Sequence, residues 1–380
     1  MPTILTSKRF VNGICGSSIN TISRMDINKL LGIKMVNGSL DDEKGGTRNL
    51  IHGNGCEMPK TTKFLLETCT TFFGVAWDAI LSLHRKPNTT KKYYFLVCAI
   101  FKDEELSLKQ WVEYHRIIGV DHFYLYNNNS TDKYKEELQQ FVDEGIVDLI
   151  EWPKPHPAQL PAYMDCFNKH KNDTQWLAYI DLDEYICPIY KNNIKLWMKK
   201  YEKYPSVYVY WKIFGDSGII DHDMNKPIIE QYISSWDRLS DIGKTFVNTD
   251  FDIVELTPKY LHEMPCKVKF LGFNIKVPPV NEFGKYVAFK TNRVGLFRKK
   301  EDFTIQINHY VSKSYVEYVL RKKKRGPGTN GGEKAKILRS MYAYYWHQRG
   351  CISCDYSAYK YLSELKVKLG YANHIKVEED

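Results

Sequence analysis

From Tyr93 onward, short apolar runs alternate with segments whose apolar residues recur every three or four positions. Such runs indicate buried strands, and the wider spacing indicates amphipathic helices. A regular strand–helix alternation predicts an α/β domain with a mostly parallel central sheet, right-handed crossovers and flanking helices. The predicted strands cover 93–101, 120–126, 146–152 and 176–180, and the predicted helices cover 103–119, 132–145 and 159–171.

The acidic stretch Asp181-Leu182-Asp183 directly follows the predicted strand 176–180. In sheets of this kind, ligands bind outside the carboxyl ends of the strands. Because side chains alternate along a strand, Asp181 and Asp183 are expected on the same side, where their charges repel each other unless a cation lies between them. Hard oxygen ligands suit Mg²⁺ or Mn²⁺, and such an ion could neutralise a diphosphate leaving group. The competing interpretation is an acidic strand end that simply faces solvent.

The second half of the chain is less regular than the first. An aromatic-rich strand over 206–214 leads into a glycine-containing loop, and a strand over 303–308 ends at His309. Two further helical patterns follow near the C-terminus. We therefore predict an N-terminal extension of unknown structure over 1–90, an α/β domain over 91–330 and a helical C-terminal tail over 331–380.

The formal net charge of +9 favours anionic partners such as nucleotide diphosphates, nucleic acid or acidic membranes. Much of the excess lies in the run 321–325, which is either a solvated helix face or a point of peripheral membrane contact. No apolar run approaches the roughly 20 residues that span a bilayer, and residues 1–10 lack the apolar core of a secretory signal. The cysteines are scattered, and the pair Cys351 and Cys354 has no second pair to complete a zinc site. These features predict a reduced, cytoplasmic protein.

Five sequence blocks occur in an order and spacing that match one known family. They are Phe101-Lys-Asp-Glu-Glu-Leu-x-Leu-x-x-Trp111-x-Glu-Tyr-His115, Gly119-Val-Asp-His-Phe-Tyr-Leu-Tyr-Asn-Asn-Asn-Ser-Thr-Asp132, Ile180-Asp-Leu-Asp-Glu-Tyr-Ile186, Trp211-Lys-x-Phe-Gly-x-Ser-Gly218 and Ile307-Asn-His-Tyr-x-x-Lys-Ser314. Together these blocks resemble glycosyltransferase family 92 and the related family-2-like transferases of the GT-A fold. The resemblance does not reach residues 1–90.

The resemblance implies a nucleotide-sugar-dependent glycosyltransferase that inverts the anomeric carbon. A UDP-sugar is the favoured donor, and the acceptor is a glycan, a lipid-linked glycan or a protein-linked glycan. Asp181 and Asp183 would be the metal-binding pair and His309 a third ligand, and imidazole beside two carboxylates suits Mn²⁺ (or Mg²⁺). Taken alone, His309 would more often be a packed histidine than a metal ligand.

The resemblance also implies a nucleotide site, in which carboxylates and amides hydrogen-bond uracil and ribose while basic side chains hold the diphosphate. An inverting transferase needs a general base for the acceptor hydroxyl, and Glu230 and Asp216 are the rival candidates. Two positions depart from the family, because Asn127 stands where Asp is usual and Asp216 where Ser is usual. Helix capping is the competing role for Asp103 and Asp132. The implied nucleotide-site residues are Asp103, Glu104, Asn127, Asn129, Asp132, Lys313 and Arg325.

Two other functional classes stay open from the sequence. A metal-dependent phosphotransferase or phosphodiesterase could use the same Asp pair, but it would need further metal ligands, and no additional His-Asp cluster is evident. A non-catalytic nucleic-acid-binding protein could use the run 321–325, with salt-sensitive binding and no metal dependence. We favour the glycosyltransferase and expect no nucleic-acid partner.

Overall fold

The computed structural model describes most of the chain from residue 78 to residue 371. The described residues are 34–36, 55–57, 78–88, 90–155, 157–240, 242–256, 264–284, 286–287, 303–322 and 340–371, with the backbone alone for 34–36, 55–57, 321 and 322. Predictions for Arg325 and for most of the range 1–90 therefore lie outside the described residues, as do those for residues 331–339 and 372–380 of the predicted tail.

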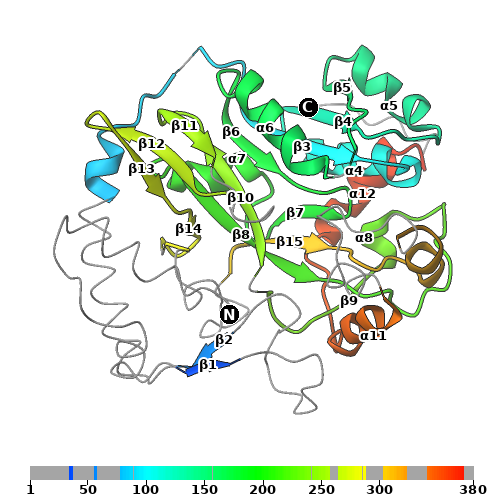
Figure 1. The fold of residues 1–380 in the computed structure, drawn as a ribbon. Helices are drawn as coiled ribbons and strands as arrows, with labels where there is room; N and C mark the ends of the chain where they lie inside the picture. Colours follow the sequence, from blue (N-terminus) through cyan, green and yellow to red (C-terminus); the bar gives the residue numbers. More distant parts are fainter. Residues whose placement is uncertain are drawn as a thin grey trace.

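Within these ranges, a nine-stranded mixed sheet forms the centre of the molecule (Figure 1). Its strands are β3 (Tyr93–Phe101), β4 (His122–Asn127), β5 (Val147–Glu151), β6 (Thr174–Tyr179), β7 (Glu184–Pro188), β8 (Ser206–Ile213), β10 (Gly243–Asn248), β14 (Val280–Asn281) and β15 (Ile305–His309). The strand order is β5-β4-β3-β6-β10-β8-β15-β7, with β14 pairing beside β8. Neighbouring strands are parallel except where β10 or β7 takes part. The predicted α/β class with a mostly parallel sheet is confirmed.

Helices and smaller strands surround this sheet. The helices are α4 (Glu105–Ile117), α5 (Tyr134–Asp143), α6 (Gln159–His170), α7 (Ile194–Met198), α8 (Ile228–Gln231), α11 (Met341–Arg349) and α12 (Leu362–Lys368), with short helical turns η1 (Lys199–Tyr201), η4 (Glu317–Lys322) and η5 (Tyr359–Tyr361). The smaller strands are β1 (Lys34–Val36) with β2 (Gly55–Glu57), β9 (Ser234–Ser235) with β16 (Ser353–Cys354), and β11 (Ile253–Leu256), β12 (Cys266–Phe270) and β13 (Phe273–Val277) in one small sheet. The predicted strands and helices of the first half are confirmed to within a few residues.

Two buried apolar clusters fill the space on either side of the sheet. In β3, Phe95 and Val97 face the cluster that includes α4, α5 and α7, whereas Leu96 and Cys98 face the cluster that includes α6 and the β11-β12-β13 sheet. Figure 1 shows these layers on the two sides of the central strands. A strand buried on both faces has a continuous apolar sequence instead of an alternating one. This explains why the run Tyr93–Phe101 predicted its strand over its full length.

Residues 78–88 pack against the sheet domain, although they belong to the range predicted as an N-terminal extension. Leu81 is fully buried in the cluster on the α6 side. The Arg85 guanidinium lies 2.9 Å from the Asp250 carboxylate and 2.9 Å from that of Glu202. Lys91 adds a second cation, 2.8 Å from the nearly inaccessible Asp250. The limits of the N-terminal part stay a prediction, but this segment contributes contacts to the core.

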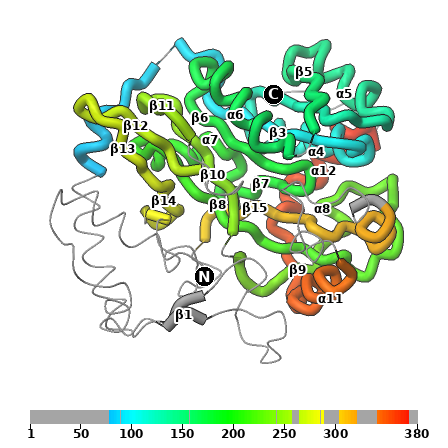
Figure 2. Tube along the Cα trace, viewed as in Figure 1, coloured from blue at the N-terminus to red at the C-terminus, as the bar shows by residue number. Residues whose placement is uncertain are grey.

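The C-terminal tail also joins the sheet domain. β16 pairs antiparallel with β9, and α12 packs against α4. Figure 2 shows these orange and red segments beside α8 and β9, which are far away in sequence. The helical character predicted for the tail agrees with α11 and α12.

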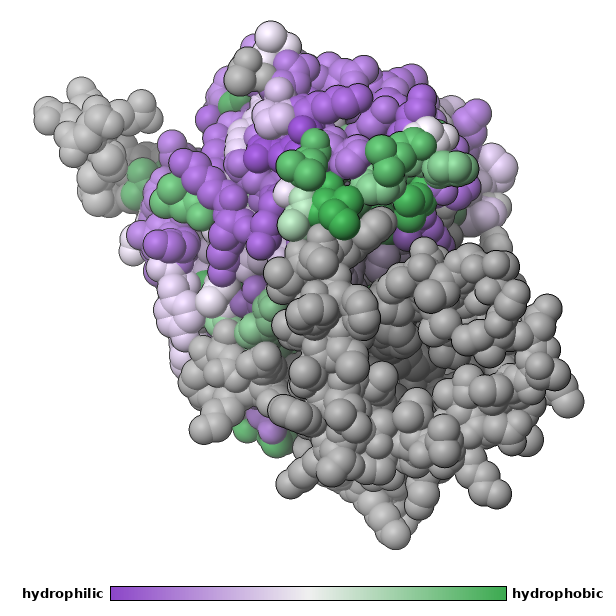
Figure 3. Space-filling model, turned by 90° about the vertical axis from the view of Figure 1, so that its left-hand side faces the viewer, coloured by the Kyte–Doolittle hydropathy of each residue, from purple (hydrophilic) through white to green (hydrophobic). Residues whose placement is uncertain are grey.

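One face of the molecule carries exposed apolar side chains. Ile80 and Leu83 come from the segment before β3, and Leu271 and Phe273 come from the turn between β12 and β13. Figure 3 shows apolar side chains gathered on this side of the molecule. Among the helices that the structure describes, none combines the length and apolar character needed to cross a membrane.

Replacing Arg85 with methionine should destabilise the fold. Asp250 is buried, with its side chain 2% exposed, so the loss of one of its two cations leaves charge uncompensated. We expect the free energy of unfolding to fall by about 2 kcal/mol, measured by urea denaturation. The matched control is Lys86→Met, because Lys86 is 77% exposed and 3.9 Å from Asp252, and it should cost less than about 1 kcal/mol. Equal small losses would show that residues 78–88 do not support the core.

Candidate functional site

The acidic stretch lies in a reverse turn between β6 and β7. The amide of Glu184 donates to the carbonyl of Asp181 at 3.0 Å, which closes the turn. β6 is parallel to β3, but β7 runs back antiparallel to β15. The chain reaches β4 and β5 on one side of β3 and then crosses to β6 on the other, so the turn lies at a topological switch point of the sheet. This is the place in an α/β sheet where ligands are expected.

The turn directs Asp181 and Asp183 to different neighbours, which corrects the expectation from strand alternation. Asp181 Oδ1 accepts hydrogen bonds from Gln159 Nε2 at 2.7 Å and from the Tyr163 hydroxyl at 3.0 Å. Asp181 Oδ2 lies 3.0 Å from Lys244 Nζ on β10. Side chains alternate only while a strand continues, and here the strand has already ended at Tyr179.

Asp183 instead belongs to a cluster with Glu184 and His309. One ligand atom from each of these three residues lies within 4.8 Å of the other two. His309 Nε2 is 3.6 Å from Asp183 Oδ1, and β15 and β7 place His309 directly opposite Glu184. The His309 ring packs on Trp211, with 4.3 Å between the ring centroids. Two carboxylates and an imidazole form a donor set that fits Mn²⁺ or Mg²⁺.

Lys244 lies behind this cluster and was missed by the sequence analysis. Its ammonium is fully buried, 3.0 Å from Asp181 and 3.3 Å from Glu184. Burial lowers the pKa of Lys244, but the two carboxylates together outweigh burial and raise it. Burial raises the pKa of the inaccessible Glu184 carboxyl well above its ordinary value, and Lys244 opposes this. The only sequence signal was one lysine in the otherwise apolar or small run Gly243–Asn248, in a region without a clear pattern.

The predicted nucleoside residues come together where the loops after β3 and β4 meet. Asp103 Oδ1 accepts from the amide of Thr131 at 2.8 Å, and Asp132 Oδ2 accepts from the amide of Glu105 at 2.8 Å. Each aspartate therefore binds the backbone of the other loop, and Asp132 caps the first turn of α4. Asn127 joins them by accepting from the amide of Ser130 at 2.9 Å.

The remaining nucleoside candidates lie at the same corner. Asn129 is exposed and has a left-handed φ of 60°. Asn127 also donates to Glu151 at 2.7 Å. The structure thus brings Asp103, Asn127, Asn129 and Asp132 to one corner of the carboxyl edge.

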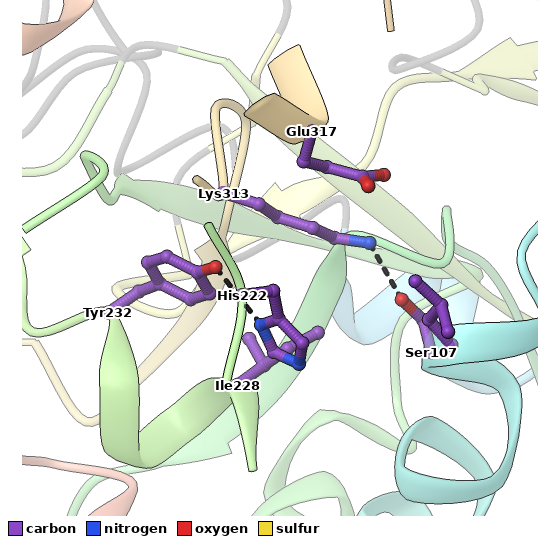
Figure 4. Close-up of a pocket in the computed structure, with 7 residues that line it drawn as sticks. Ser107, His222, Ile228, Tyr232, Lys313 and Glu317 are labelled. Carbon is purple, nitrogen blue, oxygen red and sulfur yellow. Dashed lines mark hydrogen bonds between the residues drawn. The ribbon is translucent and has the colours of Figure 1, made fainter. Parts of the chain in front are cut away.

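Lys313 links this corner to the end of β15. Its ammonium donates to the Ser107 hydroxyl on α4 at 2.7 Å (Figure 4). The same ammonium lies 3.4 Å from Glu104. A small pocket opens beside this contact, and its other lining residues are Leu106, His222, Ile228, Tyr232 and Glu317. Glu104 and Lys313, both predicted as nucleotide-site residues, therefore meet in the folded chain.

The two general-base candidates differ in their surroundings. The Glu230 carboxylate is held by Lys366 of α12, at 2.9 Å and 2.8 Å from its two oxygens. Asp216 lies in the loop after β8, where Oδ1 accepts from the amide of Gly218 at 2.9 Å and Oδ2 accepts from the Tyr344 hydroxyl. Lys366 occupies both oxygens of Glu230 and leaves less room for an acceptor hydroxyl, so these contacts favour Asp216.

Residues 91–274 match the family model of glycosyltransferase family 92. A family 92 glycosyltransferase of Arabidopsis thaliana is 26% identical over 127 residues, which cover 33% of this chain and 22% of the relative. A family 92 protein of rice is 23% identical over 142 residues, covering 37% and 24%. A galactan beta-1,4-galactosyltransferase of Arabidopsis thaliana is 26% identical over 134 residues, covering 32% and 27%. The chain thus spans about a quarter of the length of these curated relatives.

Solved structures give a weaker likeness. The Staphylococcus aureus protein TarS in complex with UDP is 10% identical, with a TM-score of 0.29. The match covers 41% of this chain and 47% of that chain. HddC from Yersinia pseudotuberculosis is 11% identical, with a TM-score of 0.27 and 52% and 98% covered. Scores this low support no argument about ligands.

Replacing Lys244 with methionine should destabilise the fold strongly and in a pH-dependent way. Asp181 and the buried Glu184 would lose their cation, which should cost about 3–5 kcal/mol near pH 8. The Glu184 pKa is raised in the folded state, so its stability contribution is fully present below the unfolded pKa near 4.5 and is lost as the pH rises. The loss should therefore be smaller at pH 5 than at pH 8, measured by urea denaturation.

The control for this variant is Lys267→Met. Lys267 forms an exposed ion pair with Glu255, so its loss should cost less than about 1 kcal/mol at either pH. A Lys244→Met protein as stable as the parent at pH 8 would contradict the role of the buried ammonium.

Proposed function

We propose that residues 91–274, which match the model of glycosyltransferase family 92, belong to a domain that transfers a sugar from a nucleotide-diphosphate sugar to a glycan acceptor with inversion at the anomeric carbon. The observation that carries the proposal is the cluster of Asp183, Glu184 and His309 at the switch point of the sheet. A transferase needs positive charge for the departing diphosphate at such an edge. The acceptor glycan is free, lipid-linked or protein-linked.

Asp183 and His309 would hold the divalent cation, with Glu184 behind them. When bound, Mn²⁺ or Mg²⁺ would supply positive charge for the diphosphate oxygens. Asp181 would have a different role, because Lys244, Gln159 and Tyr163 hold its carboxylate in place at the start of the turn. A fixed, partly exposed carboxylate can accept hydrogen bonds from donor hydroxyls. The metal site would therefore use the second aspartate of the pair and the late histidine.

The nucleoside half of the donor would bind the corner formed by Asp103, Asn127 and Asp132. Their loops are mutually hydrogen-bonded, so the corner is preformed. Lys313 contacts Glu104 and Ser107 beside this corner and is our candidate for holding the diphosphate. UDP-sugars are the first donors to test, and the galactan galactosyltransferase among the relatives makes UDP-galactose the first of these.

Asp216 is our candidate for the general base. A base accepts the acceptor proton on the side opposite the leaving group. Asp216 follows β8, which lies beside β15 and the metal cluster. Glu230 is less suited, since Lys366 engages both of its carboxylate oxygens.

The rival functions gain less support. A phosphotransferase would be expected to gather more acidic or histidine ligands, and in the part of the chain that the structure describes one such group is found. The hypothesis of nucleic-acid binding depends on the run 321–325, whose side chains lie outside the described residues.

Asp183→Asn should abolish sugar transfer while the protein stays folded. Loss of one ligand charge weakens the metal site, and we expect Mn²⁺-dependent release of UDP from UDP-sugars to fall by at least about 100-fold. Asp143→Asn on the exposed side of α5 is the control and should keep the parent rate. Chelation of divalent ions with EDTA should reduce the parent to the level of the variant. Parent-like transfer by Asp183→Asn in EDTA would rule out the metal site.

Asp216→Asn and Glu230→Gln should separate the two base candidates. We expect Asp216→Asn to lower transfer by about 10²–10⁴-fold, while UDP binding, measured by calorimetry, stays within a factor of about three of the parent. Glu230→Gln should keep transfer within about 10-fold and lower stability slightly, because only its ion pair with Lys366 is lost. If Glu230→Gln lowered the rate of sugar transfer more than Asp216→Asn, Glu230 would be the general base.

A further inference from the structure

A row of tyrosine rings lies on the surface beside the candidate site. Tyr344 packs between Tyr315 and Tyr345, with ring centroids 5.6 Å and 5.3 Å away. Tyr318 supports Tyr344 from below the surface, at 5.0 Å. Tyr344 is 4% exposed, whereas Tyr315 is 40% and Tyr345 is 61% exposed. The tyrosine row, Tyr315, Tyr344 and Tyr345, thus has a buried centre and two open ends.

Three contacts connect the tyrosine row to the carboxyl edge of the sheet. The Tyr344 hydroxyl donates to Asp216, and the amide of Tyr315 donates to the carbonyl of Ile219 at 3.1 Å, in the same loop. This loop follows β8, and the amide of Phe214 at its start donates to the carbonyl of His309 at 3.0 Å. The row therefore touches the candidate base through its central ring, Tyr344, and the loop after β8 connects it to the end of β15.

We infer that the tyrosine row is an acceptor subsite that holds the sugar rings of a saccharide chain. This inference rests on the proposed transferase function and names its acceptor class. Exposed aromatic faces can pack on the apolar C–H faces of pyranose rings, while phenolic hydroxyls bond with sugar hydroxyls. Neighbouring rings along one surface suit a chain of sugars better than a single small acceptor. The saccharide would then lie against the exposed rings of Tyr315 and Tyr345, beside Asp216.

The carboxylates beside the row favour a saccharide over a membrane, whereas the basic run 321–325 follows in the chain after Tyr318. Asp216 contacts the row directly, and Glu317 lies on η4 between Tyr315 and Tyr318 in sequence. Carboxylates accept hydrogen bonds from sugar hydroxyls, but they are repelled by the negative surface of anionic lipids. The exposed members are also tyrosines, whose hydroxyls need polar partners, and not aliphatic side chains.

The test is affinity electrophoresis of the full chain in native gels that contain soluble galactan, arabinan, xylan, glucomannan or β-glucan. We expect at least one polysaccharide to retard the parent protein. Tyr345→Ala and Tyr315→Ala should weaken that retardation about 10-fold, and Tyr345→Phe should retain most of it because the ring face is kept. The matched control is Tyr190→Ala, since Tyr190 is 64% exposed but follows β7 at the opposite edge of the sheet.

Each outcome decides the inference. No retardation by any of the five polysaccharides, or equal retardation of the parent and both alanine variants, overturns it. The inference is also overturned if the parent protein floats with phosphatidylserine vesicles and Tyr345→Ala abolishes this binding. The tyrosine row would then bind a lipid surface. UDP-sugar hydrolysis without acceptor is measured in parallel. If UDP-sugars are not hydrolysed but retardation persists and depends on Tyr345, the transferase function is rejected and a saccharide-binding surface remains. If hydrolysis is normal but no polysaccharide retards the protein, the subsite alone is rejected.

Discussion

The buried ammonium of Lys244 is the interaction on which the candidate site depends. The reverse turn after β6 carries three carboxylates within four residues, and their mutual repulsion would favour an open turn. Lys244 reaches two of them, Asp181 and Glu184, from the neighbouring strand β10. Because Lys244 and Glu184 are both buried, the attraction between them is weakly screened. Lys244 thereby stabilises the closed turn, and Asp183 lies 3.6 Å from His309.

Hydrogen bonds exchanged between two loops also fix the corner that is proposed to bind the donor. The loops after β3 and β4 bind each other through Asp103 and Asp132, and Lys313 ties the end of β15 to the start of α4. Polar side chains at a sheet edge are costly unless they are paired. By pairing with one another, these residues keep several hydrogen-bonding groups in fixed positions at an edge that water and ligand can reach. A preformed corner reduces the entropy that a flexible nucleotide site would lose on binding.

The C-terminal tail contacts both candidates for the general base. Tyr344 binds Asp216 and Lys366 binds Glu230, so each base candidate touches a residue more than a hundred positions later in the chain. The short pairing of β16 with β9 fixes the tail beside the loop after β8. The tail therefore belongs to the site physically, although it lies beyond residues 91–274 that match the family model.

The sequence by itself determined the α/β class, the strands of the first half and the residues that gather at the carboxyl edge, because burial on both faces imposes long apolar runs and strand ends impose polar ones. It also identified Asp183 and His309 as partners in one cluster, through the family resemblance. Only the tertiary structure decided that Asp181 turns to Lys244, that Glu184 replaces it beside Asp183, and that the tail reaches Asp216. These choices depend on antiparallel strands β7 and β10 and on contacts between distant segments, and neither local periodicity nor spacing encodes which strand lies next to which.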